Sequence, residues 1–447
     1  MAVALSKANR QILVLEARTD HKPRFAGELL HPTGTQVLED LGFLPSLRDM
    51  GGVDIDGFAV VKQLGLPVTA LPYAEIANAR KTGFALEHRE LVEGMRRYAK
   101  KQPGVTLVPN QKVTGVVRSP TGRVCGVQTA SGTWPAKLVL GCDGRHSKMR
   151  PLLGLAENAR LLSFSVAMHL PDSAKLLPKP TFGHIFLGAW GPMLIYPVGG
   201  PGGHDARGCF DVTRDLVGGP HGAVELLRRE YAPHLPKPLR ESLLASLAQK
   251  APQIAANEAI RTDHAVVPGA AIVGDAAGCA HPLTAAGMTV CFTDAERLGR
   301  LLGQVGDLSD AVRVDAALRV YEIERYRFVR ARELLTDALY EVFSGMDPGA
   351  RALREGIFRY WDHSEQARAR SLALLSGADS RPGAFFREYL TVVGNSATAV
   401  LAATTAHGKT ASTRDRFESL WGLTQKSLEK AALLARDVRQ ELRRQSL

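Results

Sequence analysis

Two aspartates of this chain stand where a carboxylate could meet a bound ligand. The stretch "VLGCDGRHSKMR" places Asp143 at the end of an apolar run, and "AAIVGDAAGCAHPLTAAGMTV" places Asp275 at the end of another. Both runs are predicted to be buried strands, and open α/β sheets bind ligands at the carboxyl ends of their strands. Either aspartate taken alone could equally cap a helix. The occurrence of both turns in one chain, with a His-Pro-Leu-Thr run attached to the second, favours a ligand site.

The second of these turns is crowded with small residues, namely Ala276, Ala277, Gly278, Ala285, Ala286 and Gly287. A backbone without bulky side chains can approach a flat or phosphorylated ligand closely. We expect a helix to open at Thr284, with Pro282 fixing the entry of the chain. The amide groups at a helix N-terminus attract negative charge, which suits a ligand of this kind.

The first residues have the pattern of the second half of a dinucleotide-binding βαβ unit. Residues 2–8 are predicted to end a helix, with Asn9 in the left-handed conformation that closes one, and residues 11–16 to form a strand. In such a unit the acid after this strand, here Glu16, binds the adenosine ribose. The strand and Gly-x-Gly-x-x-Gly turn that belong before them are expected upstream of Met1.

The remaining pattern predicts three kinds of structure in order. Up to about residue 160, helical and strand-like runs alternate, and "GRVCGVQTA" with "SGTWPA" predicts a hairpin in a small antiparallel insertion. Residues 161–262 have the periodicity of a second sheet, residues 263–310 return to the strand-and-glycine-turn pattern, and residues 311–447 are mostly helical. We therefore expect an α/β cofactor domain, a β-rich substrate domain and a helical C-terminal region.

Composition excludes several classes of protein. The net charge of +11 fits a phosphate-bearing cofactor, an anionic membrane or simply a solvated basic surface, but no motif interleaves basic and aromatic residues for nucleic acid. The five cysteines show no CxxC spacing, which argues for a reducing compartment and against a disulfide framework or a zinc site. No signal peptide and no apolar run of the ~20 residues needed to span a bilayer is visible. We expect a cytoplasmic protein, or one attached to a membrane surface.

Four stretches carry a resemblance to a known family. "RFAGELLHPTGTQVLEDLGF", "CDGRHSKMR", "GDAAGCAHPLTAAGMTV" and "SLALLSGADSRPGAFFREYL" resemble, in this order, motifs of the flavin-dependent monooxygenases of the p-hydroxybenzoate hydroxylase type. Within that group they are most similar to the squalene monooxygenase (squalene epoxidase) family. The resemblance spans nearly the whole chain, and its last two stretches are the more specific. It implies an FAD-binding Rossmann-like domain, here lacking its first strand, with FAD and NADPH as cofactors.

The resemblance also implies roles for individual residues. Glu16 would bind the adenosine ribose of FAD, and Arg24, the Leu29 backbone and Arg96 would contact the cofactor, with Arg89 as a rival to Arg96. Asp143 would lie near the pyrophosphate and the region visited by NADPH, and Asp275 would hold the ribityl and pyrophosphate part. The isoalloxazine ring would be lined by Pro282, Gly287 and Met288.

This chain departs from the family pattern at several places. The family's triple glycine is Ala285-Ala286-Gly287 here, and the family's Glu-Arg after the second strand is Glu16-Ala17. These departures weaken the assignment of squalene itself more than the assignment of FAD. For the missing glycine turn two explanations stay open, a start codon assigned too late or a remnant with impaired FAD binding. A stop codon upstream of Met1, before any such in-frame motif, would exclude the first.

The chemistry implied by the resemblance belongs to the flavin, so we assign no catalytic acid or base. The expected reaction inserts one oxygen atom from O2 into a lipophilic alkene, with electrons supplied by NADPH directly or through a flavin-reducing partner. Tyr196, His184 and His281 could hydrogen-bond in the pocket, and a structural role is the alternative for each. "TFGHIFLGAWGPMLIYPVG" would line the substrate cavity, and the C-terminal amphipathic helices would touch a membrane surface or pack as ordinary helices. The alternatives are a hydroxylase of an aromatic or quinone-like product, a reductase of isoprenoid chains, or a non-catalytic remnant.

Overall fold

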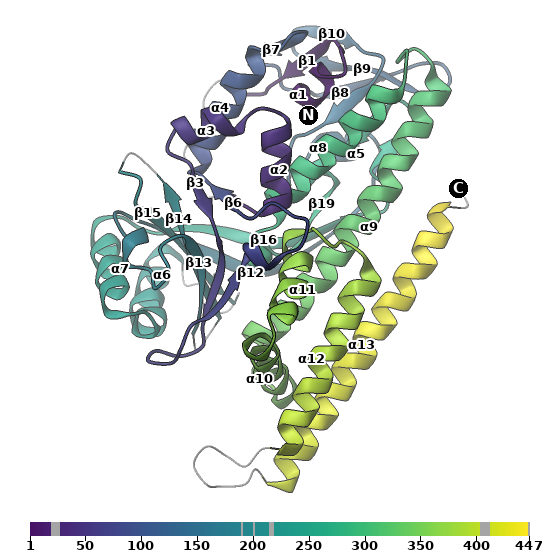
Figure 1. Cartoon of the computed structure of the whole chain (residues 1–447). Helices are drawn as coiled ribbons and strands as arrows, with labels where there is room; N and C mark the ends of the chain where they lie inside the picture. Colours follow the sequence, from purple (N-terminus) through teal and green to yellow (C-terminus); the bar gives the residue numbers. More distant parts are fainter. Residues whose placement is uncertain (19–26, 189–190, 200–201, 214–218, 403–411, 446–447) are drawn as a thin grey trace.

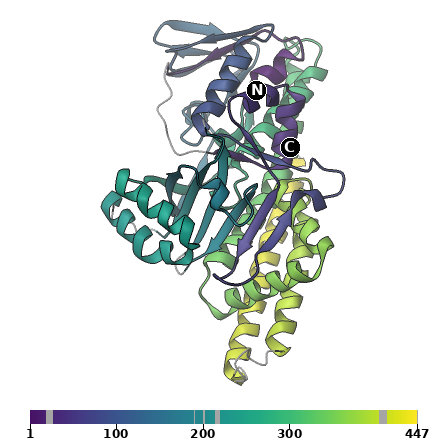
Figure 2. The same ribbon diagram turned by 60° about the vertical axis from the view of Figure 1, so that its left-hand side comes forward.

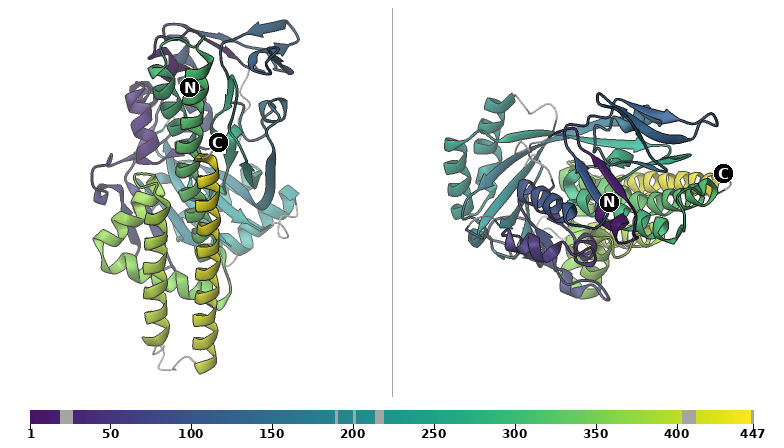
Figure 3. Two further views of the ribbon diagram at one scale, coloured as in Figure 1. Left: turned by 90° about the vertical axis from the view of Figure 1, so that its right-hand side faces the viewer. Right: turned by 90° about the horizontal axis from the view of Figure 1, so that it is seen from above.

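The computed structural model describes residues 1–18, 27–188, 191–199, 202–213, 219–402 and 412–445. An α/β region that contains the N-terminus lies at one end of the molecule, a large sheet lies beside its middle, and a bundle of helices forms the other end (Figure 1). The long helix α9 (Ala311–Ser344) runs from the first region into the helical bundle, as the side view in Figure 3 also shows. One rigid element therefore joins the two ends.

Two pairs of parallel strands form the centre of the α/β region. Strand β1 (Ile12–Leu15) pairs in parallel with β7 (Val105–Val108). Strand β11 (Val139–Gly141) pairs in parallel with β18 (Ala270–Ile272), and β17 (Val266–Val267) adds an antiparallel strand. Parallel strands end at the same edge of a sheet. The turns that follow β11 and β18, which carry the two aspartates, therefore leave the sheet side by side.

Further elements surround these strands. The predicted antiparallel insertion is confirmed, because β9 pairs with both β8 and β10. Its strands are β8 (Gly115–Arg118), β9 (Val124–Thr129) and β10 (Gly132–Pro135). A second small sheet contains β2 (Leu29–Leu30), β6 (Gly83–Ala85) and β3 (Val53–Ile55). The helices of this region are α1 (Ala2–Ser6), α2 (Pro32–Asp40), α3 (Leu44–Asp49), α4 (His88–Lys100), α5 (Met149–Leu152) and α8 (Gly287–Gln304).

An eight-stranded sheet with the order β19-β16-β12-β15-β14-β13-β4-β5 is the largest layer. Successive residues point to opposite faces, so Phe186 packs toward helices α6 (Gly219–Leu226) and α7 (Lys237–Gln249), while Ile185 packs toward the helical bundle. Figure 2 shows these teal helices on one side of the sheet and the green helices on the other. The strands are β4 (Gly57–Val61), β5 (Thr69–Pro72), β12 (Glu157–Leu170), β13 (Phe182–Leu187), β14 (Pro192–Gly199), β15 (Asp205–Val212), β16 (Gln253–Thr262) and β19 (Gly278–Cys279).

The helical bundle has boundaries that local sequence explains. The side chains of Asp310, Asp347 and Ser364 accept hydrogen bonds from backbone amides three residues later, at 3.1, 3.0 and 3.2 Å, and so cap α9, α10 and α11. Gly377, with φ +81°, ends α11 in the left-handed conformation. The helices after α9 are α10 (Pro348–His363), α11 (Glu365–Ser376), α12 (Pro382–Ala402) and α13 (Thr413–Gln445).

Two predictions of element boundaries have different outcomes. The N-terminal helix ends as expected, with Asn9 in the left-handed conformation at φ 55°. The expectation that a helix opens at Thr284 is wrong. A short 3₁₀ turn covers Pro282–Thr284, Ala285 has φ +50°, and α8 begins only at Gly287. The left-handed residue breaks the helical path and redirects the chain before the helix starts.

Candidate functional site

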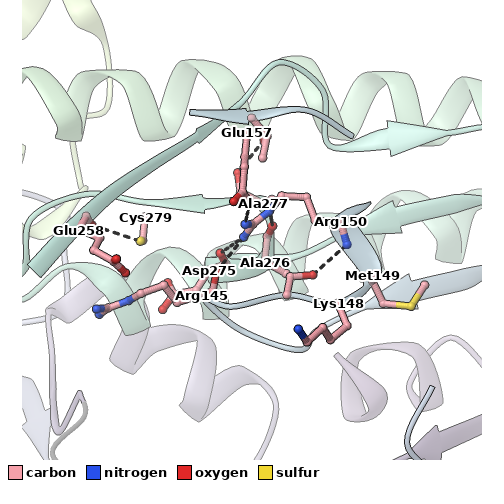
Figure 4. A network of polar contacts seen from close by, with 12 residues as sticks. Arg145, Lys148, Met149, Arg150, Glu157, Glu258, Asp275, Ala276, Ala277 and Cys279 are labelled. Carbon is pink, nitrogen blue, oxygen red and sulfur yellow. Dashed lines mark hydrogen bonds and ion pairs between the residues drawn. The ribbon is translucent and has the colours of Figure 1, made fainter. Parts of the chain in front are cut away.

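The two aspartate turns meet and are tied together by a buried arginine. Arg150, the last residue of the "CDGRHSKMR" stretch, is 2% exposed. Its Nε donates to the Ala276 carbonyl at 3.0 Å, and one terminal nitrogen lies 3.0 Å from the Arg145 carbonyl and 3.4 Å from the Asp275 carbonyl. The other terminal nitrogen pairs with Glu157 (Figure 4). One guanidinium therefore fixes the backbone of the second turn against the first.

The carboxylate of Asp275 in the second turn is half-buried and lies near Arg145 and Cys291. Burial raises the pKa of this carboxyl, and the Arg145 guanidinium opposes that rise. Among the described residues, its carboxylate accepts a weak hydrogen bond from the Cys291 thiol, at 3.7 Å. Gly274 precedes it at φ +62°, and a Cβ at this position would lie 2.7 Å from the Cys291 sulfur. The turn thus holds a half-buried acceptor with little hydrogen bonding of its own.

An apolar cavity opens beside the His-Pro-Leu-Thr turn. Its empty volume, including the part open to solvent, is about 930 Å³. Leu283 and Thr284 of the turn form part of its wall, strands β4, β5 and β13 contribute Phe58, Leu71 and Ile185, and helices α9–α12 enclose the rest. The remaining lining includes Ala338, Leu339, Val342, Leu353, Ile357, Trp361, Phe385 and Val392. The cavity can take a lipophilic molecule and exclude water from it.

Two neutral histidines hold the turn that borders this cavity. His31 is fully buried, its Nδ1 lies 2.6 Å from the Tyr73 hydroxyl, and its Nε2 lies 2.7 Å from the Thr284 carbonyl. A carbonyl only accepts, so Nε2 carries the proton and the tyrosine donates to Nδ1. Burial lowers the pKa of His31 to about 3. From the other side, Nδ1 of His281 accepts the amide proton of Leu283 at 3.1 Å.

Comparison with known proteins identifies the family of this chain. The family model described as "Squalene epoxidase" matches residues 135–412. Squalene epoxidase erg1 of Aspergillus fumigatus is 30% identical over 372 residues, which cover 81% of this chain and 76% of that protein. Squalene monooxygenase of Mus musculus is 27% identical over 402 residues, which cover 88% of this chain and 68% of that protein.

The chain belongs to the squalene epoxidase family. It is an FAD-dependent monooxygenase, as the motifs predicted. Solved structures agree on the fold. The p-nitrophenol 4-monooxygenase PnpA from Pseudomonas putida superposes with a TM-score of 0.70 at 17% identity, covering 84% of this chain and 94% of that one. Klebsiella pneumoniae HpxO, complexed with FAD and uric acid, gives 0.68 at 21% identity, covering 84% and 93%. The predicted α/β hydroxylase-type fold with a helical C-terminal part is confirmed.

The second turn of this squalene epoxidase family member fits FAD. The half-buried Asp275 carboxylate has the acceptor capacity that ribityl hydroxyl groups require, because its own hydrogen bonding is weak. Gly287 begins the 18-residue helix α8, and among the described residues no atom other than its chain neighbours and the nearby backbone of that helix lies within 4 Å of where its Cβ would be. Open space at a helix N-terminus suits a phosphorylated or electron-rich ligand. This turn therefore suits FAD, and the contacts of Asp275 and Gly287 with the cofactor stay predictions.

The other predicted cofactor residues lie around the same turn. A Cβ on Gly27 would lie 2.8 Å from Met288 Cγ, so the segment before Leu29 runs directly beside the start of α8. Leu29 is buried in β2, and Pro282 is exposed at the turn. Arg24 lies outside the described residues. The roles of all these residues toward FAD remain predictions.

Glu16 and Arg96 contact each other. Glu16 follows β1, and its Oε2 lies 2.5 Å from a terminal nitrogen of Arg96 on α4. The rival Arg89 is exposed near the start of α4 and has no contact with Glu16 that the structure describes. Of the two arginines, Arg96 is therefore the one that lies beside Glu16, the residue predicted to bind the adenosine ribose.

The carboxylate of Asp143 is used within its own turn. Its oxygens accept from the Ser147 hydroxyl at 2.6 Å and from the amides of Lys148 and Met149 at 2.6 and 3.0 Å. Asp143 is not the N-cap of the short helix α5, which is Lys148, but it accepts from the amide of the first helical residue, Met149, and so has the kind of structural role that the sequence left open. The contribution of Asp143 to cofactor binding stays a prediction.

Several important residues were not singled out from the sequence. Glu28 is 1% exposed and forms an ion pair with Arg207 of β15 at 2.7 Å, and the Tyr196 hydroxyl donates to it at 3.2 Å. Arg150 and His31 were also missed. Glu28, His31 and Arg150 all lie inside the quoted motifs. The presence of a charged or polar residue within a family motif could therefore have pointed to them.

Proposed function

We propose that this protein epoxidises a lipophilic, squalene-like alkene, using NADPH as the source of electrons. The observation that supports this most is the apolar cavity, because its wall includes Leu283 and Thr284 of the turn predicted to contact the flavin. A hydrocarbon offers no hydrogen-bonding groups, so its binding depends on the burial of apolar surface, about 25 cal/mol per Å². Membership of the squalene epoxidase family supports the same substrate class.

The residues of the chain bind and orient, while FAD supplies the activation of oxygen when it is bound. The cavity wall holds the alkene beside the turn and keeps bulk water away. Asp275 would accept from the cofactor, and the His31 and His281 contacts hold the backbone at Thr284 and Leu283. No side chain of the cavity is required as an acid or a base for oxygen insertion.

The test is product analysis with the full chain loaded with FAD. We expect NADPH-dependent conversion of squalene to a mono-epoxide that carries one oxygen atom from ¹⁸O₂. Parallel reactions with and without an added flavin reductase decide whether NADPH acts directly or through a partner protein. FAD-loaded protein that oxidises NADPH without forming an epoxide would refute the substrate assignment. A phenol from an aromatic substrate would establish the hydroxylase alternative, and a reduced alkene the reductase.

We also propose peripheral contact with a membrane surface through α12 and α13. No helix among the described residues is long and apolar enough to cross a bilayer. Exposed apolar side chains nevertheless gather on these helices, with Leu401 62%, Phe417 67%, Trp421 56% and Leu428 65% exposed. The two helices extend beyond the rest of the molecule (Figures 1 and 3). A lipophilic substrate would arrive from such a surface.

Flotation with anionic vesicles tests this contact. We expect the protein to float with vesicles that contain phosphatidylserine, and the Phe417→Ser/Trp421→Ser double variant to remain behind. Since both side chains are exposed, the double variant should unfold at the wild-type temperature. Absence of the wild-type protein from the vesicle fraction would reject the membrane proposal without affecting the assignment of the reaction.

A further inference from the structure

A buried polar network lies at the His-Pro-Leu-Thr turn and includes His281, the residue before the predicted FAD contact Pro282. Its members come from three neighbouring strands of the eight-stranded sheet and from the turn itself. Ser163 (β12), Asp211 (β15), Asn257 (β16) and His281 are 0%, 8%, 2% and 5% exposed. In the register of the sheet, Ser163 lies opposite Asn257, and Ser165 opposite Asp211. Residues 163 and 165 point to the same face, so pairing brings all these side chains together.

The hydrogen bonds of this network have one consistent direction. The Ser165 hydroxyl donates to the Asn257 carbonyl oxygen at 2.9 Å, and the Asn257 amide donates to the Ser163 oxygen at 2.8 Å. The Ser163 hydroxyl donates to Asp211 Oδ1 at 2.6 Å. Buried polar groups that are fully paired in this way define a single arrangement of their side chains.

His281 connects this network to the turn. Its Nδ1 accepts from the Leu283 amide at 3.1 Å, so the proton must be on Nε2. Nε2 lies 2.8 Å from the Ser163 oxygen and 3.2 Å from Asp211 Oδ1. The Tyr340 ring of α9, with its centroid 4.8 Å from that of His281, closes the other side. The tautomer that binds the turn is thus the one that Asp211 and Ser163 select.

The same geometry excludes a hydrolytic triad. In a Ser-His-Asp triad the carboxylate and the serine bind opposite nitrogens of the imidazole. Here Ser163 and Asp211 both lie at Nε2, while Nδ1 is taken by the Leu283 amide. Ser163 is also fully buried, so no substrate can reach its hydroxyl. The network therefore does not act as a hydrolytic site, and its contacts fix the orientation of the His281 ring.

We propose that Asp211 and Ser163 are positioning residues that lock the His281 ring and, through it, the Pro282–Thr284 turn between the FAD site and the cavity. Leu283 and Thr284 lie in the cavity wall, so a loose turn would admit water where substrate and cofactor meet. Oxygen would then be reduced without being inserted into the substrate, so that NADPH, H⁺ and O₂ would give NADP⁺ and H₂O₂. This last consequence rests on the proposed function, whereas the locking of the turn does not.

Hydrogen–deuterium exchange of the full chain, with neither FAD nor substrate added, tests the locking. In Ser163→Ala and in Asp211→Ala we expect amides in peptides spanning residues 281–287 to exchange about tenfold faster, the change expected for one lost hydrogen bond. The matched control is Asp205→Ala, because Asp205 also lies on β15 and contacts a histidine of β12, His169, at 3.1 Å, away from the turn. Asp205→Ala should leave residues 281–287 unchanged.

The outcomes separate a positioning role from a general loss of structure. Should Asp211→Ala fail to fold, Ser163→Ala carries the test, and Ser163→Thr, which keeps a hydroxyl, should restore protection of residues 281–287. In the FAD-loaded protein we expect Ser163→Ala to raise the H₂O₂ formed per NADPH several-fold at unchanged affinity for FAD. Wild-type exchange of residues 281–287 in a folded Ser163→Ala variant would overturn the proposal, as would an equal effect of Asp205→Ala.

Discussion

Two polar residues at this site, Asp275 and His31, differ in how far the protein satisfies their hydrogen-bonding groups. Asp275 is a half-buried acceptor with a weak hydrogen bond from the Cys291 thiol, and His31 is a buried histidine whose two nitrogens are both bound. These are opposite situations. An acceptor with spare capacity suits a ligand, whereas a fully paired ring suits the protein's own architecture. Each case predicts a measurable response to substitution.

Substitution Asp275→Asn should move cofactor affinity and apoprotein stability in opposite directions. Burial raises the pKa of this carboxyl, so the charged form is unfavourable in the folded protein and its removal should raise the melting temperature without FAD. Hydrogen bonds to a charged acceptor contribute about 1.5–3 kcal/mol, so FAD should bind about 10–100-fold more weakly. Flavin fluorescence titration and calorimetry measure the two quantities. The exposed Asp263→Asn is the control, and unchanged FAD affinity in Asp275→Asn would contradict the assigned role.

His31 should make the protein less stable in acid. Its pKa is about 3 in the folded protein and near 6.5 when unfolded, so between these values only the unfolded chain takes up the proton. Stability is therefore complete above about pH 6.5 and falls as the pH drops, by up to about 1.4 kcal/mol per pH unit for this group. We expect urea unfolding at pH 6, 5 and 4 to show a shallower pH dependence in His31→Gln than in the wild type. The same change at the exposed His146 should leave the wild-type slope.

At the scale of elements, the site depends on the meeting of two parallel strands. β11 and β18 are far apart in the chain, but they pair in register from Val139 with Ala270 to Gly141 with Ile272. Their turns then share the Arg150 guanidinium (Figure 4). A single side chain thereby connects the two motifs that carried the prediction of a flavin site.

Replacement of Arg150 should uncouple the two turns. Arg150→Met keeps a long apolar stem but leaves the carbonyls of Arg145 and Ala276 without this donor. We expect the free energy of unfolding to fall by about 2–4 kcal/mol and FAD retention to fall with it. Denaturant unfolding of Arg150→Met beside Arg160→Met, an exposed arginine of β12, measures the first. A stability within 0.5 kcal/mol of the wild type, about the range of neutral surface changes, would show that the link is dispensable.

At the scale of the whole molecule, the cavity exists because two layers face each other. The sheet supplies one wall through β4, β5 and β13, and the helical bundle supplies the other (Figure 2). α9 belongs to both the cofactor region and the bundle, so it sets the distance between the turn and the far wall of the cavity. Under the proposed function, specificity for a long substrate would depend on this arrangement rather than on any one residue.

Filling the cavity should abolish turnover of large substrates and leave the cofactor site intact. Ala338 of α9 lines the cavity and is 7% exposed. Ala338→Trp should lower kcat/KM for a squalene-sized alkene by at least about 100-fold, whereas Ala338→Val, which adds little volume, should have a small effect. FAD content and the flavin absorption spectrum serve as controls for folding. Full activity in a folded Ala338→Trp variant would show that the substrate binds elsewhere.

By itself the sequence determined the order of the elements and the two aspartate turns, because these depend on local pattern, while its motifs indicated the cofactor class only through their resemblance to a known family. Apolar runs that end in glycine and acid predict strand ends, and helical periodicity predicted α4 and the C-terminal helices. The start of α8 was placed three residues too early, since the left-handed Ala285 depends on its surroundings. Only the tertiary structure decided that Asp143 caps its own turn, that Arg150 joins both turns, and that His281 is locked by Ser163 and Asp211. The Asp143 contacts lie within one turn, whereas those of Arg150 and His281 join segments distant in sequence. Pairing register, which no local pattern encodes, places those segments together.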